Sequence, residues 1–404
     1  MVTLPRATAL VALALAALVA CTPPAQINPS SAQPAPTTSA PAKATAQAAT
    51  PTPSEAGDQI LTPEERSRNT PTPVAGLAAG VRVAPYVEGI TMPIALTFAP
   101  DGRLFFIEYL KGEVRVADAE GNLQAAPFAT PNARIHKEQG VLGIAIDPEF
   151  EQNRWVYIFF TQASGNANRA DDNRVVRYTE RDGIGTERTV IMKDLPVGVC
   201  CHNGGRIGFG PDSKLYITIG DVNDGDKAQN PNRLHGKILR VNRDGTIPAD
   251  NPDPASPMFA RGFRNPFGLA FHPTTGLPYI SENGEVGHDE INRVIPGGNY
   301  GNPTYDGKVG QPGFVDPVWE SGVGRVAPSG AAFYTGSQMP EYRGDFFFCA
   351  FNTGDLTRMR LGGPDYDQIE QQDVVYRGCN LDVADGPRGA LYIATFTGIM
   401  QVGR

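Results

Sequence analysis

The stretch Ile207-Gly208-Phe209-Gly210-Pro211-Asp212-Ser213-Lys214-Leu215-Tyr216-Ile217-Thr218-Ile219 predicts a short strand, a turn and a second strand. Its two halves are rich in apolar and aromatic residues, and the Pro211-Asp212 pair between them favours a turn. The same pattern recurs six times along the chain. The recurring apolar residue stands at positions 98, 146, 209, 271, 333 and 383, at intervals of 48, 63, 62, 62 and 50 residues.

Each interval accommodates four short strands with their loops. Gly and Pro are abundant, with 45 and 36 residues, whereas helical periodicity is scarce. These features predict an all-β fold, a six-bladed β-propeller with four-stranded antiparallel blades. The innermost strand of each blade should line a central channel, so residues just before each copy should gather at one mouth. These residues are Glu138, Gln139, His202, Arg264, Asn265, Cys379 and Asn380.

The N-terminal residues are typical of a bacterial lipoprotein signal peptide. Residues 1–20 combine Arg6 with an apolar run, and Cys21 follows directly. We therefore expect Cys21 to carry a lipid that anchors the protein to a membrane, at the cell surface or in the periplasm. The alternatives are an ordinary cleaved signal peptide and an anchor helix. Residues 21–79, rich in Pro, Ala and Thr, predict a disordered tether, and residues 80–404 form the propeller.

Charge and cysteine content restrict the partners and the compartment. The net charge of -8 and the absence of basic clusters argue against a nucleic-acid partner. Export places the four cysteines of the propeller in an oxidising compartment, where disulfides form. Two pairings are open from the sequence: Cys379 with either Cys200 or Cys201, or a vicinal bridge between Cys200 and Cys201. A metal site built from Cys and His is a further alternative.

His202 and Asp221 are the candidate chemical groups. His202 lies between two cysteines and two glycines, and two predicted strands separate it from Asp221. Such a strand pair brings both residues to one end of a sheet, where they would form a general base and its orienting carboxylate. The alternative is a loop histidine and a turn aspartate. Residues 221–226 also resemble part of a calcium loop, although no Glu follows at the spacing that completes one.

Several motifs occur in order along the propeller. They are His202-x-Gly204-Gly205-Arg206, Arg261-Gly262-Phe263-Arg264-Asn265-Pro266-Phe267-Gly268, Glu282-Asn283-Gly284, Asp289-Glu290-Ile291-Asn292 and Asn299-Tyr300-Gly301. Together they resemble the glucose/sorbosone dehydrogenases, a family that includes soluble sugar dehydrogenases using pyrroloquinoline quinone (PQQ) and calcium. The resemblance covers about residues 82 to 404. Each motif alone is weak, and their order gives the match its specificity.

The resemblance implies oxidation of an aldose sugar at its anomeric carbon. His202 would be the general base, Asp221 its orienting partner and PQQ the hydride acceptor, with electrons passing to an acceptor that the sequence does not identify. Arg264 would contact the quinone oxygens. The other implied cofactor contacts are Glu138, Gln139, Asn265, Asn283, Asn352 and Cys379. The implied calcium ligands are the carbonyls of Gly284 and Glu285 at one site, and Glu290 with the Tyr300 carbonyl at a second, structural site.

The chain departs from the family pattern where PQQ carboxylates would bind. A lysine of the family falls on Asn352, and two arginines fall on Cys379 and Leu381. Each charge-assisted contact with a carboxylate contributes about 1.5–3 kcal/mol, so the loss of three cations should weaken PQQ binding. These departures support an alternative function, a PQQ-free propeller that binds a carbohydrate or a protein. A third hypothesis is a calcium-dependent hydrolase or lactonase, which would need a cluster of carboxylates in the channel.

Overall fold

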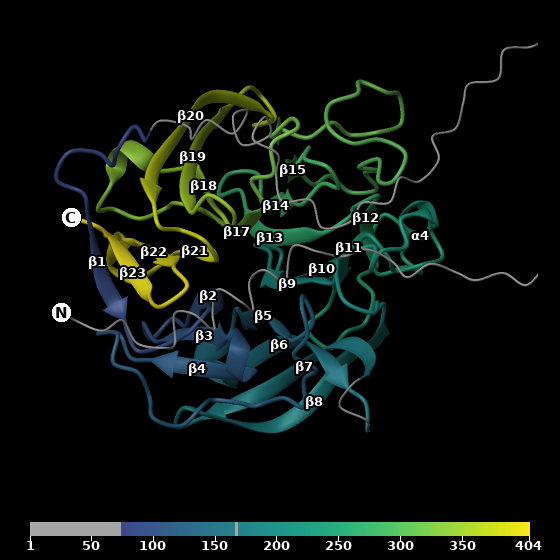
Figure 1. The fold of residues 1–404 in the computed structure, drawn as a ribbon. Helices are drawn as coiled ribbons and strands as arrows, with labels where there is room; N and C mark the ends of the chain where they lie inside the picture. The colour runs from purple at the N-terminus through teal and green to yellow at the C-terminus, as the bar shows by residue number, and fades with distance from the viewer. Residues whose placement is uncertain (1–73, 166–168) are drawn as a thin grey trace, which may run out of the picture.

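The structure is a computed structural model that describes residues 74–165 and 169–404. The predicted signal peptide with Cys21, and most of the predicted tether, lie outside these residues. Six antiparallel sheets stand around a central axis (Figure 1). In the described part of the chain, the helices are short, and none of them has the length and apolar character needed to cross a membrane.

The blades follow one another along the chain. Blade 1 contains β2 (Pro93–Phe98), β3 (Leu104–Glu108) and β4 (Glu113–Ala117). Blade 2 contains β5 (Val141–Ile146), β6 (Trp155–Ala163), β7 (Ala170–Arg181) and β8 (Ile184–Leu195). Blade 3 contains β9 (Gly204–Phe209), β10 (Leu215–Ile219), β11 (Lys237–Val241) and β12 (Met258–Arg261). Blades 4 and 5 contain β13 (Pro266–Phe271), β14 (Pro278–Glu282), β15 (Glu290–Arg293) and β16 (Trp319–Glu320), then β17 (Pro328–Phe333), β18 (Phe346–Ala350), β19 (Asp355–Gly362) and β20 (Gln368–Arg377).

Blade 6 joins the two ends of the propeller. It contains β21 (Asp382–Asp385), β22 (Leu391–Ala394), β23 (Ile399–Gly403) and, at its outer edge, β1 (Arg82–Val87). Figure 1 shows β1 beside β23, with Arg82 paired with Gly403. The short helices α3 (Phe150–Asn153) and α4 (Asp226–Gln229) and the 3-10 turns η1 (Tyr109–Lys111), η2 (Pro340–Tyr342) and η3 (Pro387–Gly389) lie in connections. Pairing of an early strand with the last ones closes the ring.

The six-bladed propeller predicted from the recurring pattern is confirmed. The apolar residues at positions 98, 146, 209, 271 and 333 are the last residues of β2, β5, β9, β13 and β17, and Val383 lies within β21. These innermost strands contact one another around the axis. One blade differs from the predicted four strands, because beside β4 the chain forms only isolated bridges, from Leu123 to Ala117 and from Ala129 to Val114.

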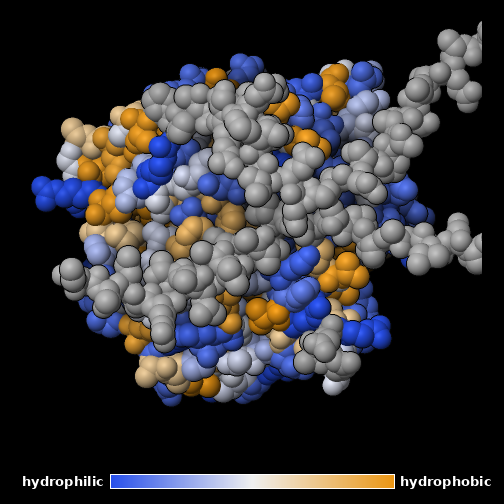
Figure 2. Space-filling model, in the orientation of Figure 1, coloured by the Kyte–Doolittle hydropathy of each residue, from blue (hydrophilic) through white to orange (hydrophobic). Residues whose placement is uncertain are grey.

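The core lies between neighbouring blades. The second strands β3, β10, β14, β18 and β22 are buried along their whole length, as their nearly continuous apolar sequences lead one to expect. Aromatic rings connect the blades edge to face: Tyr157 and Phe209 have centroids 5.1 Å apart, and Tyr279 and Phe333 have centroids 5.2 Å apart. On the part of the surface that described residues form in Figure 2, hydrophobic residues are scattered among hydrophilic ones.

Candidate active site

His202 and Asp221 meet at the mouth where β9 begins and β10 ends. The imidazole Nδ1 lies 2.8 Å from Oδ1 of Asp221, and both side chains are buried. Gly220 permits this approach, because a Cβ there would lie 2.0 Å from the carbonyl oxygen of His202. The backbone N–H of Val222 then donates to that same carbonyl, at 3.1 Å. The predicted pairing of the two residues is therefore confirmed as geometry.

Asp221 accepts hydrogen bonds on both carboxylate oxygens. The backbone N–H of Asn223 donates to Oδ1 at 2.8 Å, and Nδ2 of Asn302 donates to Oδ2 at 3.1 Å. Because the Asp221 carboxylate is an acceptor at both oxygens, Nδ1 of His202 must carry the proton and donate it to Oδ1. In the neutral imidazole the lone pair is then on Nε2, which is the arrangement a general base needs.

Glu138 joins three blades at the same mouth. Its Oε2 accepts the backbone N–H of His202 at 2.7 Å and Nδ2 of Asn265 at 3.1 Å. Burial raises the pKa of Glu138, and the facing His202 opposes that rise. Residues that precede β5, β9 and β13 thus contact one another, as expected for residues placed before the innermost strands.

Arg264 turns its guanidinium toward the loop after β14. Its Nη1 donates to the carbonyls of Asn283 and Gly284, at 2.9 and 3.0 Å. The Glu285 carbonyl accepts a longer bond from Arg325, at 3.4 Å. The two carbonyls predicted to bind calcium thus accept guanidinium donors in this structure. A calcium ion at this position would have to displace Arg264.

Some of the buried oxygen atoms without a hydrogen-bond partner lie at this mouth. In residues 74–165 and 169–404, the side-chain oxygens in this state are those of Gln139, Asn265, Asn283, Asn292 and Asp385. Gln139 and Asn265 are fully or almost fully buried, and their nitrogens already donate, to the Gly198 carbonyl at 2.7 Å and to Glu138. Their free oxygens fit the hydroxyl or N–H groups of a bound molecule.

The four cysteines of the described residues form two disulfides. Cys200 pairs with Cys201, so the predicted vicinal bridge is confirmed. Cys379 pairs with Cys349 on β18, so the predicted bridge from Cys379 to Cys200 or Cys201 is wrong. All four thiols are used in these bonds, which excludes the Cys/His metal site. Cys379 is fully buried in its disulfide and offers no group to a cofactor.

The side of the mouth expected to hold carboxylates is only partly cationic. Asn352 is exposed after β18, and its Nδ2 donates to the Arg325 carbonyl at 3.0 Å. Asn352, which replaces the family's lysine, therefore contacts Arg325, and Arg325 is exposed. Leu381 is buried and contributes no charge. Arg264 and Arg325 are the cations that fit carboxylate or quinone oxygens here.

A second group of oxygens lies behind the mouth. Glu282 and Glu290 are paired across β14 and β15, and Nδ2 of Asn292 donates to both, at 3.0 and 2.8 Å. Burial raises the pKa of Glu282 well above its ordinary value and that of Glu290 to about 7. Facing carboxylates are unfavourable unless they share a proton or a cation, and hard oxygens suit calcium. Glu282 was not predicted as a site residue, although strand register across the hairpin places it opposite Glu290.

The other proposed metal loop has different partners. Asp221 is bonded to His202, and Asp224 forms an ion pair with Lys227 at 2.6 Å. Helix α4 begins at Asp226. Within the described ranges, no three or more His, Cys, Asp or Glu side chains are grouped as a metal site would require. Residues 221–226 thus form a turn that orients Asp221 and show no convergent ligand set.

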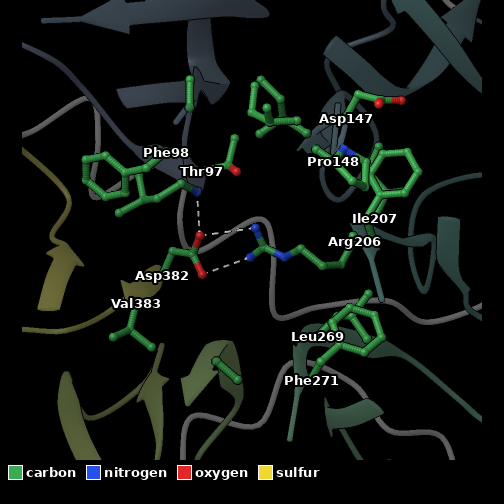
Figure 3. A pocket seen from close by; sticks show the side chains of 18 of the residues that line it. Thr97, Phe98, Asp147, Pro148, Arg206, Ile207, Leu269, Phe271, Asp382 and Val383 are labelled. Atoms are coloured by element: carbon green, nitrogen blue, oxygen red, sulfur yellow. Dashed lines mark hydrogen bonds and ion pairs between the residues drawn. The ribbon is translucent and has the colours of Figure 1, made fainter. Parts of the chain in front are cut away.

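A cavity of about 450 Å³ lies at the opposite end of the innermost strands (Figure 3). Phe98, Phe209 and Phe271 line it, and the guanidinium of Arg206 crosses it to the carboxylate of Asp382. The two Arg206–Asp382 contacts measure 3.1 and 3.2 Å. The cavity extends along the innermost strands as far as Arg206 and Asp382, and His202, which precedes β9, is not among the residues that line it.

Comparisons with known proteins agree with this architecture. The family model described as Glucose / Sorbosone dehydrogenase matches residues 90–399. The aldose sugar dehydrogenase YliI of Escherichia coli is 28% identical over 338 residues, covering 78% of this chain and 90% of that protein. The PQQ-bound aldose sugar dehydrogenase of Streptomyces coelicolor is 28% identical with a TM-score of 0.70, covering 82% of this chain and 99% of the other. Human hedgehog-interacting protein is 28% identical over 225 residues, covering 46% and 31% of the two chains.

Proposed function

The chain belongs to the glucose/sorbosone dehydrogenase family, and from this membership we propose that it oxidises an aldose sugar at its anomeric carbon with PQQ as hydride acceptor. The observation that carries the proposal is the 2.8 Å contact between Nδ1 of His202 and Asp221 at a mouth that also holds unpaired amide oxygens. A positioned base and hydroxyl-binding acceptors are what sugar oxidation requires.

His202 performs the proton transfer. Its Nε2 takes the proton from the anomeric hydroxyl, and a hydride leaves the anomeric carbon, so the sugar becomes a lactone. Asp221 stabilises the imidazolium that forms and keeps the ring oriented. When bound, PQQ supplies the electrophilic quinone that takes up the hydride. A base in this role contributes typically about 10²–10⁴-fold in rate.

Residues of the same mouth would hold the cofactor. Arg264 and Arg325 offer guanidinium groups to quinone or carboxylate oxygens, and Asn265 and Gln139 offer unpaired oxygens to hydroxyl or N–H donors. Calcium fits better at Glu282 and Glu290, where two buried carboxylates face each other, than at the carbonyls that now accept Arg264 and Arg325. Charge neutralisation there would favour the folded blade.

Location and electron transfer are part of the same proposal. A lipid on Cys21 would hold the enzyme on a membrane outside the cytoplasm, where it would meet sugar and an electron acceptor. Globomycin treatment of expressing cells tests this, because it blocks lipoprotein signal cleavage and should leave the precursor unprocessed. Cys21→Ala should abolish incorporation of labelled palmitate into the protein. A Cys21→Ala protein that still incorporates palmitate would contradict the anchor at Cys21.

A binding module without PQQ is the second candidate. Asn352, Cys379 and Leu381 stand where the family has cations, and the match to human hedgehog-interacting protein shows that similar sequence occurs in a protein not named as a dehydrogenase. Sugar binding would then rest on the unpaired amide oxygens, with no turnover. This candidate predicts retention on a carbohydrate column without any dye reduction.

Reconstitution separates the two candidates. The purified propeller is mixed with PQQ and calcium, binding is followed by quenching of protein fluorescence, and dye reduction is measured over a panel of aldoses. Binding with turnover that His202→Gln abolishes supports the enzyme. Absence of PQQ binding at micromolar concentration rejects it, and turnover that His202→Gln retains removes His202 from its role.

A further inference from the structure

The vicinal disulfide lies immediately before the base. Cys200 is 8% exposed and Cys201 is fully buried, and His202 follows with a backbone φ of +55°. Residues other than glycine seldom adopt this left-handed conformation, so the surrounding structure must hold His202 there. The ring closed by a vicinal bridge includes the peptide bond between the two cysteines. The ring therefore restricts the backbone dihedral angles of Cys200 and Cys201, which set the position of His202.

Asn223 connects the disulfide to the carboxylate that orients the base. Its Nδ2 contacts Sγ of Cys200 at 3.9 Å and the carbonyl of Cys201 at 3.4 Å. Its backbone N–H donates to Oδ1 of Asp221 at 2.8 Å, the same oxygen that accepts from Nδ1 of His202. One residue thus touches the disulfide with its side chain and the catalytic carboxylate with its backbone.

Hydrogen bonds from residues before β5 and from Asn203 hold the same segment. Gln139 Nε2 donates to the carbonyl of Gly198, and Asn203 Nδ2 donates to the carbonyl of Cys200 at 3.3 Å. Glu138 accepts the backbone N–H of His202. These bonds hold the carbonyls of Gly198 and Cys200 and the backbone N–H of His202, and the bridge adds a covalent restraint between Cys200 and Cys201. The other disulfide, between Cys349 and Cys379, lies in the apolar core of blades 5 and 6, a cluster that does not include His202.

We propose that the vicinal disulfide, together with Asn223, is a positioning element that holds the His202 imidazole on Asp221 with its proton on Nδ1. The element leaves Nε2 directed at the sugar. It acts through His202 and touches no substrate. The proposal rests on the proposed function for its kinetic consequence, whereas the state of the imidazole can be measured without cofactor or sugar.

Removal of the bridge tests the proposal kinetically. In the PQQ-reconstituted enzyme, Cys200→Ser/Cys201→Ser should lower kcat about 10- to 100-fold, because small displacements of a reacting group carry costs of that order. KM should stay within about twofold, since the variant replaces no residue that the proposed function assigns to sugar or cofactor binding. The matched control is Cys349→Ser/Cys379→Ser, which removes the other disulfide and should lower the melting temperature while leaving kcat unchanged. An equal loss of kcat in both variants would assign the effect to general stability and overturn the proposal.

The imidazole ¹⁵N spectrum of the cofactor-free protein gives the independent readout. The chain has five histidines, so His202→Gln assigns the His202 signals by their loss. The native protein should show distinct protonated Nδ1 and unprotonated Nε2 resonances. Without the vicinal bridge the two resonances should move toward each other as the tautomers mix. An unchanged tautomer pattern in the folded variant would overturn the proposal.

A milder variant keeps the test decisive if the double cysteine variant does not fold. Asn223→Gly retains the backbone N–H to Asp221 and tolerates the φ of +65° at this position, but it loses both contacts to the disulfide. We expect tautomer mixing and a smaller fall in kcat, and native values for both would contradict the role of Asn223. If native protein never gains activity with PQQ, the proposed function fails, and the ¹⁵N spectra still decide whether the disulfide positions His202.

Discussion

Glu282 and Glu290 lie directly opposite each other on β14 and β15, and both carboxylates are buried. They share one amide donor, Nδ2 of Asn292. Cross-strand pairs of like charge destabilise a sheet, and the low polarity of the site increases that cost. A shared proton relieves this repulsion, and the calcium ion of the proposed function would do so as well.

Calcium should raise the melting temperature through this pair. A ligand at one hundred times its Kd stabilises the native state by about 2.7 kcal/mol, which corresponds to a rise of several degrees. Glu290→Gln should abolish the calcium-dependent rise and, in EDTA, should melt no lower than the native protein because the repulsion is gone. Scanning calorimetry with calcium or EDTA measures both effects.

The exposed Glu88 provides the control for this experiment. Glu88→Gln changes the same chemical group at the surface, and its calcium-dependent rise should equal that of the native protein. A Glu290→Gln protein that still gains several degrees with calcium would place the ion elsewhere.

Arg206 and Asp382 connect blades across the channel. Their side chains are 11% and 4% exposed, and Asp382 also accepts the backbone N–H of Leu96 at 2.6 Å. Removal of one partner leaves a buried charge, so Asp382→Asn should lower the free energy of unfolding by about 3–5 kcal/mol. The midpoint of urea unfolding reports this loss.

The exposed pair Arg388–Glu120 gives the comparison for the channel ion pair. Its side chains are 56% and 64% exposed, so Glu120→Gln should change the free energy of unfolding by less than about 1 kcal/mol. Arg206→Met/Asp382→Leu should recover most of the loss, because neither charge remains buried. If Asp382→Asn and Glu120→Gln both change the free energy of unfolding by less than about 1 kcal/mol, the channel pair is solvated.

The fold could be predicted because each blade repeats the same local pattern. Phe98, Phe209 and Phe271 each end an innermost strand at the position that the repeat indicated. Local turn and strand preferences fix this pattern, and six copies leave one closed arrangement. The missing fourth strand of blade 1 could not be seen in the same way. Residues 123–129 run beside β4 but form only isolated bridges with it. Whether such a segment forms a continuous ladder depends on how the edge of the blade is covered.

The site was predictable where residues are close along one strand pair and not where they come from separate loops. His202 and Asp221 flank β9 and β10, so strand geometry brings them together. Arg264 was expected to face the quinone, but its direction depends on the carbonyls of the loop after β14. Cys379 pairs with Cys349 on the neighbouring blade, and sequence separation does not encode that contact.

Asp221→Asn should impair catalysis more than stability. Three donors face this side chain, from His202, Asn223 and Asn302, and an amide has a single acceptor oxygen. The imidazole would then lose its fixed Nδ1 proton. We expect kcat with PQQ to fall by about 10²–10⁴-fold, comparable to loss of the base itself. His136→Gln, at an exposed histidine, should keep native kcat, and a fully active Asp221→Asn enzyme would exclude the orienting role.

Lys237 should make stability depend on pH above neutrality. Its Nζ is fully buried and donates to the carbonyls of Ala228 and His235, both at 2.7 Å. Burial lowers the pKa of this ammonium to about 7, whereas an unfolded lysine titrates near about 10.4. Between these values the unfolded chain binds more protons, so the free energy of unfolding rises with pH, by up to about 1.4 kcal/mol per unit. In urea titrations between about pH 7 and 9, Lys237→Met should lose this rise of the free energy of unfolding with pH. Lys193→Met, at the surface, should keep it. An equal rise in the native protein and both variants would show that Lys237 stays charged when folded.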